Sequence, residues 1–233
     1  MKKVISSLIA LMLLSFSIQA QISGSFKIGL STYQGDLHDL ADDNIKFLDE
    51  ANISLGLGIR LPLSEVLGLR AEATYFQLTA DETQFTDESG HVARGWGFNN
   101  KFLEISALVD YEIFGKKRFN DSGDFKRTLT PVVFGGLGLA FNDPTVNWKS
   151  ASSTEITEDE NDVPGVLITL PIGLGLKYHI SERFALSLEA GYRLPISDYY
   201  DGISKAANPN KNDSFGFGGI KAYFALGRND MNN

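Results

Sequence analysis

The sequence contains no cysteine and three histidines among its 233 residues. Disulfide bridges and thiolate metal sites are therefore unavailable to it. An exported protein of this size without disulfides must take its stability from core packing, from barrel closure or from insertion into a bilayer.

Long apolar runs are also lacking beyond the first 20 residues. A membrane-spanning helix needs roughly 20 consecutive apolar residues, so a membrane-embedded form of this chain has to be a β-barrel. The opening stretch MKKVISSLIALMLLSFSIQA combines Lys2 and Lys3 with a short apolar run and the small residue Ala20. This pattern predicts a secretory signal peptide over 1–20, followed by one domain over 21–233.

Basic residues are outnumbered, with 21 Lys and Arg against 29 Asp and Glu. This balance argues against nucleic acid as a partner, because nucleic-acid binding needs a basic patch. Neither a phosphate-binding loop nor a nucleophile elbow nor a zinc signature is present, so we expect no cofactor, no metal and no small-molecule substrate. His38, His91 and His179 are not spaced with a serine as a barrel hydrolase needs. We therefore expect no enzyme, and a lipid-modifying barrel enzyme is the least favoured alternative.

Alternation of apolar and polar residues is the strongest pattern in the chain. The stretch "TLPIGLGLKYHISERFALSLEAGYR" (169–193) separates into an apolar and a polar or small set with a period of two, which predicts a β-hairpin. Eight segments show such patterning, and the segment over 129–141 is apolar on both faces. The pattern predicts an all-β, eight-stranded, antiparallel, up-and-down transmembrane barrel of the outer-membrane type.

The connections alternate in length along the chain. Four are long (34–50, 79–98, 142–164 and 195–214), and between them lie the short 62–65 and 180–183 and the intermediate 114–127. Short periplasmic turns, long extracellular loops and an even strand number are typical of outer-membrane barrels, with both termini periplasmic. The acidic segment 151–164 favours a solvated, mobile loop, with calcium binding as the sharper alternative.

The polar face carries charged residues of both signs beside many glycines. In an eight-stranded barrel the interior is just wide enough for side chains, so opposite charges should pair across it and glycines should make room for them. This predicts a filled barrel without an open channel. The expected charge network comprises Arg60, Arg70, Glu72, Glu104, Asp110, Glu112, Lys177, Glu189, Arg193 and Lys221.

Aromatic residues fall at two levels of the apolar face, as in the girdles of outer-membrane barrels. The level near the expected periplasmic end comprises Phe26, Tyr111, Tyr178, Phe184 and Phe224, and the other comprises Tyr75, Phe141 and Tyr192. A soluble lipocalin-like barrel is the structural alternative, and it would place the apolar face inside and the charged face in water.

Three stretches go beyond this general pattern: "IGLSTYQGDL" (28–37), "LTPVVFGGLGLAF" (129–141) and "LPIGLGLKYHISERFALSLEAGYRLPISDYYDGIS" (170–204). Over about 24–227 the chain resembles the PorG-like outer-membrane β-barrel family, which is associated with the type IX secretion system. The most specific pieces are "YQGDL" and "SDYYDGIS", in which Gly35, Asp36, Asp198 and Tyr199 match the family.

The resemblance implies a non-enzymatic, structural or accessory component of a type IX secretion assembly. It implies location in the cell outer membrane of a Gram-negative bacterium, contact with lipid and contact with periplasmic secretion proteins. The connection 114–127 is long for a periplasmic turn and is the candidate contact for such partners. Its basic residues are Lys116, Lys117, Arg118, Lys126 and Arg127. The alternative function is an OmpX/OmpA-like surface barrel acting in adhesion or envelope integrity.

Overall fold

The computed structural model describes residues 22–35, 37, 51–82, 95–120, 122–149, 153–207 and 212–226. The expected signal peptide, His38, His91 and Asp36 lie outside these residues. The strands are β1 (Ser23–Gln34), β2 (Asn52–Pro62), β3 (Leu67–Asp81), β4 (Gly97–Glu112), β5 (Thr128–Phe141), β6 (Pro144–Asn147), β7 (Val166–Thr169), β8 (Pro171–His179), β9 (Phe184–Ser197) and β10 (Asp213–Ala225).

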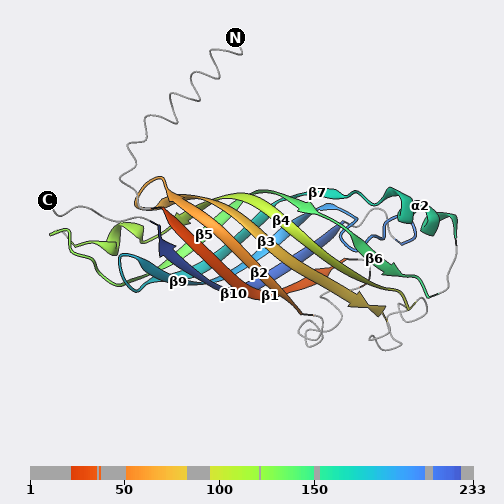
Figure 1. Ribbon diagram of the computed structural model, residues 1–233, viewed down its shortest axis with the longest axis horizontal. Coiled ribbons are helices and arrows are strands. Elements are labelled where there is room, and N and C mark those ends of the chain that lie inside the picture. Colours follow the sequence, from red (N-terminus) through yellow and green to blue (C-terminus); the bar gives the residue numbers. More distant parts are fainter. Residues whose placement is uncertain are drawn as a thin grey trace, which may run out of the picture.

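Eight of these strands form a closed antiparallel barrel (Figure 1). Each pairs with its neighbours in chain order, and pairing of β1 with β10 closes the ring. The short β6 pairs with the start of β4, and β7 pairs with the end of β5, so both extend the barrel wall at one end. The predicted eight-stranded up-and-down barrel is confirmed.

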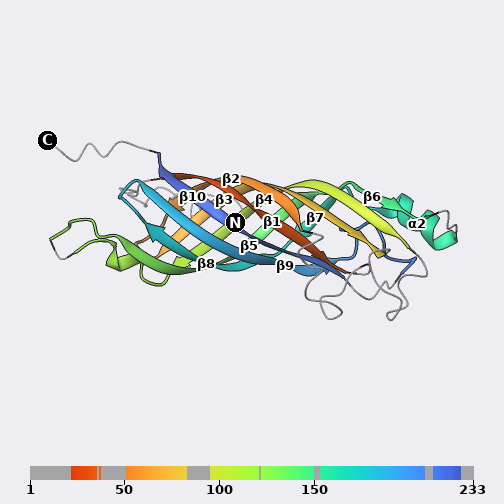
Figure 2. The same cartoon turned by 90° about the horizontal axis from the view of Figure 1, so that it is seen from below.

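The two ends of the barrel differ, and we call them the loop end and the turn end. The loop end carries β6, β7 and the helix α2 (Thr154–Asp162) (Figures 1 and 2). The turn end carries the connections 63–66, 113–127 and 180–183. Close to the connection 180–183, the backbone N–H of Leu226 donates a hydrogen bond to the Ile22 carbonyl oxygen (2.6 Å). Within the described residues, no helix has the length and apolar character needed to cross a membrane.

The two shortest turns share one local structure that the sequence specifies. The Ser64 hydroxyl accepts hydrogen bonds from the backbone N–H groups of Val66 and Leu67, at 3.3 and 3.0 Å. The Ser181 hydroxyl accepts the equivalent bonds from Arg183 and Phe184. A serine hydroxyl that binds backbone N–H groups two and three residues on stabilises a tight turn, so both hairpins are fixed locally.

The outer face of the barrel is apolar almost throughout. Leu57, Leu174 and Leu188 are 66%, 63% and 61% exposed, and large apolar side chains stand outward on all eight barrel strands. Phe26, Tyr178 and Phe224 of one predicted aromatic level are exposed on the outer face, and so is Tyr75 of the other level, where Tyr192 is half-buried. Soluble monomers rarely expose an apolar surface of this extent. In this barrel the charged face of the strands lies inside. The soluble lipocalin-like alternative, which needs the opposite arrangement, is wrong.

The interior has two parts, one of which the sequence analysis missed. Charged side chains lie inside, as expected, and they fill the half nearer the turn end. The half nearer the loop end holds an aromatic core that includes Phe76, Phe102, Phe134, Phe215 and Phe217. The expectation that the inward face is only polar or small is therefore wrong for this half. The interior of an eight-stranded barrel is just wide enough to be filled by side chains. Aromatic rings fill it in the half that holds few charged groups.

Candidate functional site

All ten residues of the expected charge network lie inside the barrel, and none is more than 6% exposed. They come from β2, β3, β4, β8, β9 and β10, because each occupies the inward parity of its strand. Lys27 of β1 joins them, with its ammonium 3.6 Å from the Glu72 carboxylate. Buried charges of this kind need partners, and the geometry supplies them.

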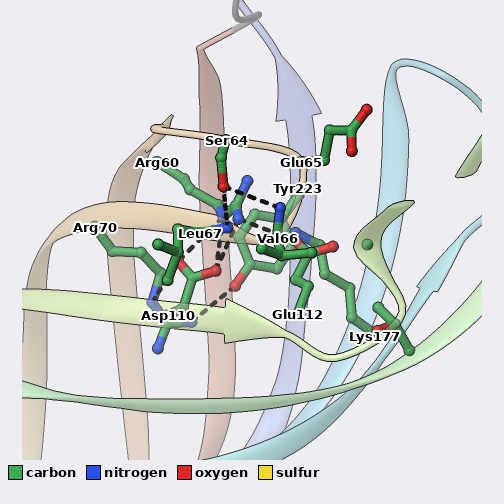
Figure 3. Close-up of polar contacts among 12 residues, drawn as sticks. Arg60, Ser64, Glu65, Val66, Leu67, Arg70, Asp110, Glu112, Lys177 and Tyr223 are labelled. Carbon is green, nitrogen blue, oxygen red and sulfur yellow. Dashed lines mark hydrogen bonds and ion pairs between the residues drawn. The ribbon is translucent and has the colours of Figure 1, made fainter. Parts of the chain in front are cut away.

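Glu112 organises the part of the network nearest the turn end (Figure 3). Its carboxylate lies 3.0 Å from the Arg60 guanidinium, 2.9 Å from Lys177 Nζ and 3.0 Å from His179 Nε2. Arg60 also donates to both carboxylate oxygens of Asp110, through Nη2 to Oδ2 (2.8 Å) and through Nε to Oδ1 (3.1 Å), a bidentate arrangement. His179 is thus held by a carboxylate within the network.

Glu189 organises the middle of the network. It lies 2.9 Å from Arg70 Nη1 and 3.2 Å from Lys221 Nζ, and it accepts a hydrogen bond from the Tyr223 hydroxyl at 2.8 Å. Glu72 contacts the same two cations, with Arg70 Nε at 3.2 Å and Lys221 Nζ hydrogen-bonded to it. Two carboxylates and two cations therefore alternate in space, which ties β3, β9 and β10 together across the barrel.

Arg193 connects the charged half to the aromatic half. Its guanidinium donates to Glu104 through Nη2 (2.6 Å) and Nε (3.1 Å). The same group lies 4.7 Å from the ring centres of Phe76 and Phe217, which is within cation–π range. The sequence held a signal for these rings, because Phe76 shares the parity of Arg70 and Glu72 on β3.

The inward glycines make room for these large groups, as the sequence indicated. A Cβ at Gly68 would lie 2.5 Å from the Arg60 guanidinium, and one at Gly175 would lie 3.0 Å from Glu189 Cγ. In the aromatic half, a Cβ at Gly173 would lie 2.3 Å from the Phe134 ring. The barrel interior is thus filled by a fit between glycines and long or aromatic side chains.

The two specific motifs meet at the loop end. The Tyr33 hydroxyl of "YQGDL" hydrogen-bonds Asp201 of "SDYYDGIS" and also Asp213 (2.7 Å). Asp213 in turn accepts from the backbone N–H of Tyr200 at 3.0 Å. A Cβ at Gly35 would lie 1.9 Å from the Tyr33 hydroxyl, which explains the glycine there. The motif residues therefore lock β1, β10 and the segment after β9 into one cap.

The other matched motif residues lie in the same cap. Asp198 is buried, and Tyr199 packs against the aromatic core. The Tyr200 ring lies 5.2 Å from that of Phe215, centre to centre, and burial raises the pKa of the Tyr200 hydroxyl. These positions act in packing and hydrogen bonding within the cap.

The acidic segment 151–164 differs from the solvated, mobile loop that the sequence predicts. Its described part forms α2, whose first N–H groups are capped by the Ser153 hydroxyl, and the Asp159 side chain is fully buried. The Asp159 carboxylate accepts backbone N–H groups of Ser204 (3.1 Å), Lys205 (3.0 Å) and Ala206 (3.0 Å). A solvated mobile loop is thus the wrong interpretation of 153–164. Among the residues described, no cluster suited to a metal ion occurs.

Asp159→Asn should release α2 from the segment 204–206. Hydrogen bonds to a charged acceptor contribute about 1.5–3 kcal/mol each, and the neutral amide weakens all three. We expect α2 to show hydrogen exchange at least about tenfold faster by mass spectrometry, with the barrel strands unchanged. The control is Glu160→Gln, an exposed acidic residue one position along the helix. Equal protection of α2 in both variants would contradict this role of Asp159.

Lys205 adds a surface contact to the same junction. Its ammonium lies 2.6 Å from Asp162 and 3.1 Å from Glu158 of α2. The hydrogen bonds with Asp162 and Glu158 raise the pKa of Lys205. The pair is solvent-exposed, so Asp159 is the main contact that holds the helix.

The connection 114–127 forms an ordered extension of the turn end, which we call the arm. It contains the 3-10 helix η4 (Gly115–Arg118), and Lys126 N donates to Arg118 O at 2.7 Å. The Arg118 guanidinium donates to Glu65 O at 3.0 Å, so this residue ties the arm to the neighbouring turn. Lys116, Lys126 and Arg127 are exposed. The side chain of Lys117 lies outside what the structure describes.

The arm also carries aromatic residues that the sequence analysis did not single out. Phe114 and Phe119 are 41% and 51% exposed, and the Phe119 and Phe125 rings lie edge to face. Aromatic residues and Arg are enriched on surfaces that contact proteins, whereas Lys is depleted there.

One protein family matches nearly the whole chain. Residues 2–226 match the family described as "Domain of unknown function (DUF6089)". The chain belongs to this family. No curated protein matches the sequence of this DUF6089 member.

Several solved structures share the barrel. Neisserial surface protein A aligns with a TM-score of 0.50 and 11% identity, covering 89% of this chain and 98% of that one. Ail of Yersinia pestis aligns at 0.40 and 12% identity (90% and 100% covered), and OprG of Pseudomonas aeruginosa at 0.39 and 14% (88% and 95% covered). At such identities the likeness shows the fold alone. The DUF6089 chain thus has the fold of an outer-membrane barrel.

Proposed function

We propose that this chain is a non-enzymatic barrel of the outer membrane, with its turn end in the periplasm and its loop end outside. One observation carries the proposal: large apolar side chains cover the outer face, whereas the charged side chains lie inside. Only hydrocarbon solvates such a face without cost, and a closed barrel leaves no unpaired strand edge within it. The aromatic residues at two levels suit the two membrane interfaces.

The filled interior supports a structural role. Ion pairs occupy the half nearer the turn end and aromatic rings occupy the other, so the barrel axis is blocked by side chains. His179, the one histidine among the described residues, is engaged with Glu112. These features favour a rigid membrane scaffold over a channel or a hydrolase.

Within this role, we propose an accessory function in a type IX protein secretion assembly, with periplasmic secretion proteins as partners. The support is the resemblance of "YQGDL" and "SDYYDGIS" to PorG-like barrels, together with the ordered arm at the turn end. The arm offers Lys116, Lys126 and Arg127 beside the exposed ring of Phe119. A rigid, basic and aromatic projection suits an acidic protein surface.

Charge reversal of the arm tests this contact. In the triple variant Lys116→Glu, Lys126→Glu, Arg127→Glu, we expect recovery of periplasmic partners after crosslinking in native membranes to fall at least about tenfold. Arg118 stays unchanged, because it holds the arm in place. The matched control is Arg183→Glu, which reverses an exposed charge in another turn of the same end. Unchanged recovery in the triple variant would disprove docking through the arm.

A surface barrel acting in adhesion or envelope integrity is the second candidate, and the ordered cap at the loop end favours it. Asp159, Tyr33 and Asp213 hold α2 and the segment after β9 in fixed positions. Deleting the gene separates the two functions: loss of protein secretion with normal detergent resistance supports the first, and the reverse supports the second.

A further inference from the structure

The outer face has one feature that a smooth lipid-facing surface lacks. A hollow of about 430 Å³ lies over β9, β10 and β1 near the loop end. Its lining includes Leu30, Thr32, Ala190, Tyr192, Gly216 and Gly218.

Strand register explains the shape of this hollow. Gly218 of β10 lies between Leu30 of β1 and Ala190 of β9, and in the next row Gly216 lies between Thr32 and Tyr192. One row toward the turn end, the same strands carry Ile28, Ile220 and Leu188, all exposed. Glycine and alanine thus form a floor, and large side chains border it.

The two glycines of the floor differ from the inward glycines. Within the described part of the chain, a Cβ at Gly218 would meet nothing within 4 Å, and one at Gly216 would meet only ordinary contacts from 3.7 Å. Neither belongs to the glycines with positive φ. Barrel packing therefore does not require glycine here, although glycine is unfavourable in a strand. Because Gly216 and Gly218 have no side chains, they leave the space on the outer face that forms the hollow.

Among the described residues, the rim of the hollow toward the loop end is polar and uncharged. The Tyr192 hydroxyl lies 3.1 Å from Gln34 Oε1 and is hydrogen-bonded to the Ser214 hydroxyl. Hydroxyl and amide groups at this position can donate to a carbonyl oxygen, and no charged side chain takes part in these bonds.

We infer that this hollow binds one acyl chain of a bilayer lipid, with the ester or amide carbonyl of that lipid at the Tyr192 rim. The inference rests on the proposed membrane location. Leu30, Ala190 and Gly218 of the lining are exposed on the lipid-facing band, so hydrocarbon reaches the hollow from that side, whereas Thr32 is buried. A chain lying in a groove contacts protein on three sides, which adds dispersion contacts that a flat wall cannot offer. The uncharged rim fits the neutral linkage between an acyl chain and its headgroup.

Filling the floor of the groove tests the inference. The full chain is purified in detergent and given dipalmitoyl phosphatidylethanolamine, and retained lipid is counted by native mass spectrometry. For Gly218→Leu we expect the singly lipid-bound species to fall at least about tenfold, because the leucine occupies the place of several methylene groups. The matched control is Ala107→Leu, an exposed outward position on β4, four strands away around the barrel. This control should retain lipid like the unchanged protein.

Equal retention by Gly218→Leu and the unchanged protein would overturn the inference, as would equal loss in both leucine variants. Insertion into vesicles is measured separately, by the electrophoretic shift between folded and heat-unfolded barrel. Both leucine variants should insert normally. Failure of the unchanged protein to insert would instead contradict the membrane location, so the two failures are distinguishable.

Discussion

Glu189→Gln should lower the free energy of unfolding by about 3–5 kcal/mol, the usual result of removing one partner of a buried ion pair. Glu189 contacts Arg70, Lys221 and the Tyr223 hydroxyl in the middle of the barrel. The charge network, with Lys27 included, holds six Lys and Arg side chains against five carboxylates, and the variant leaves four. Unfolding by urea in phospholipid vesicles, followed by circular dichroism, measures the loss.

Two further variants show whether the loss comes from unpaired charge. Glu182→Gln changes an exposed carboxylate in the turn 180–183, and its effect should stay within about 0.5 kcal/mol. Adding Lys221→Met to Glu189→Gln removes a cation that the first change left short of a partner. The double variant should therefore be more stable than the single one by about 1 kcal/mol or more. Additive losses would show that the charges act independently.

Gly136→Ala and Gly218→Ala should change stability in opposite directions. A Cβ at Gly136 would lie 2.0 Å from the Ala107 carbonyl oxygen and 2.8 Å from Leu108 Cα. These are backbone atoms of the neighbouring strand, so no rotamer change relieves the contact, and we expect a loss of about 1–3 kcal/mol or more.

At Gly218 the added methyl group has open space. Alanine restricts the unfolded chain more than glycine does, so we expect a gain of about 0.4–1 kcal/mol. The same urea titration in vesicles measures both variants. A destabilised Gly218→Ala or an unchanged Gly136→Ala would show that the interior and the outer face are not packed as described.

Much of the barrel could be predicted because strands carry local information. A period of two assigns each residue to a face, and it assigns Arg70, Glu189 and Lys221 to the inside of the barrel. Connection lengths gave the order of the strands and the two unlike ends. Which carboxylate meets which cation could not be predicted, since those contacts join strands far apart in sequence.

The features that were missed depend on position along the barrel axis. Parity placed Phe76 and Phe217 on the inward face, but it does not show that several such rings reach one level and form a core. The cap was missed for the same reason, because Tyr33 and Asp213 are distant in sequence. The helix α2 had a local signal in Ser153 followed by an acidic first turn, which the overall acidity of the segment obscured.

Labelling of single cysteines in intact cells tests the central claim, location in the outer membrane with the loop end outside, most directly. The chain has no cysteine, so each introduced thiol is the only one in it. A membrane-impermeant maleimide should label Glu160→Cys on α2 in intact cells, and Ser122→Cys in the arm only after the outer membrane is permeabilised. Leu57→Cys, on the outer face, should stay unlabelled in both cases. Labelling of Leu57→Cys from water, or of Ser122→Cys in intact cells, would contradict the account.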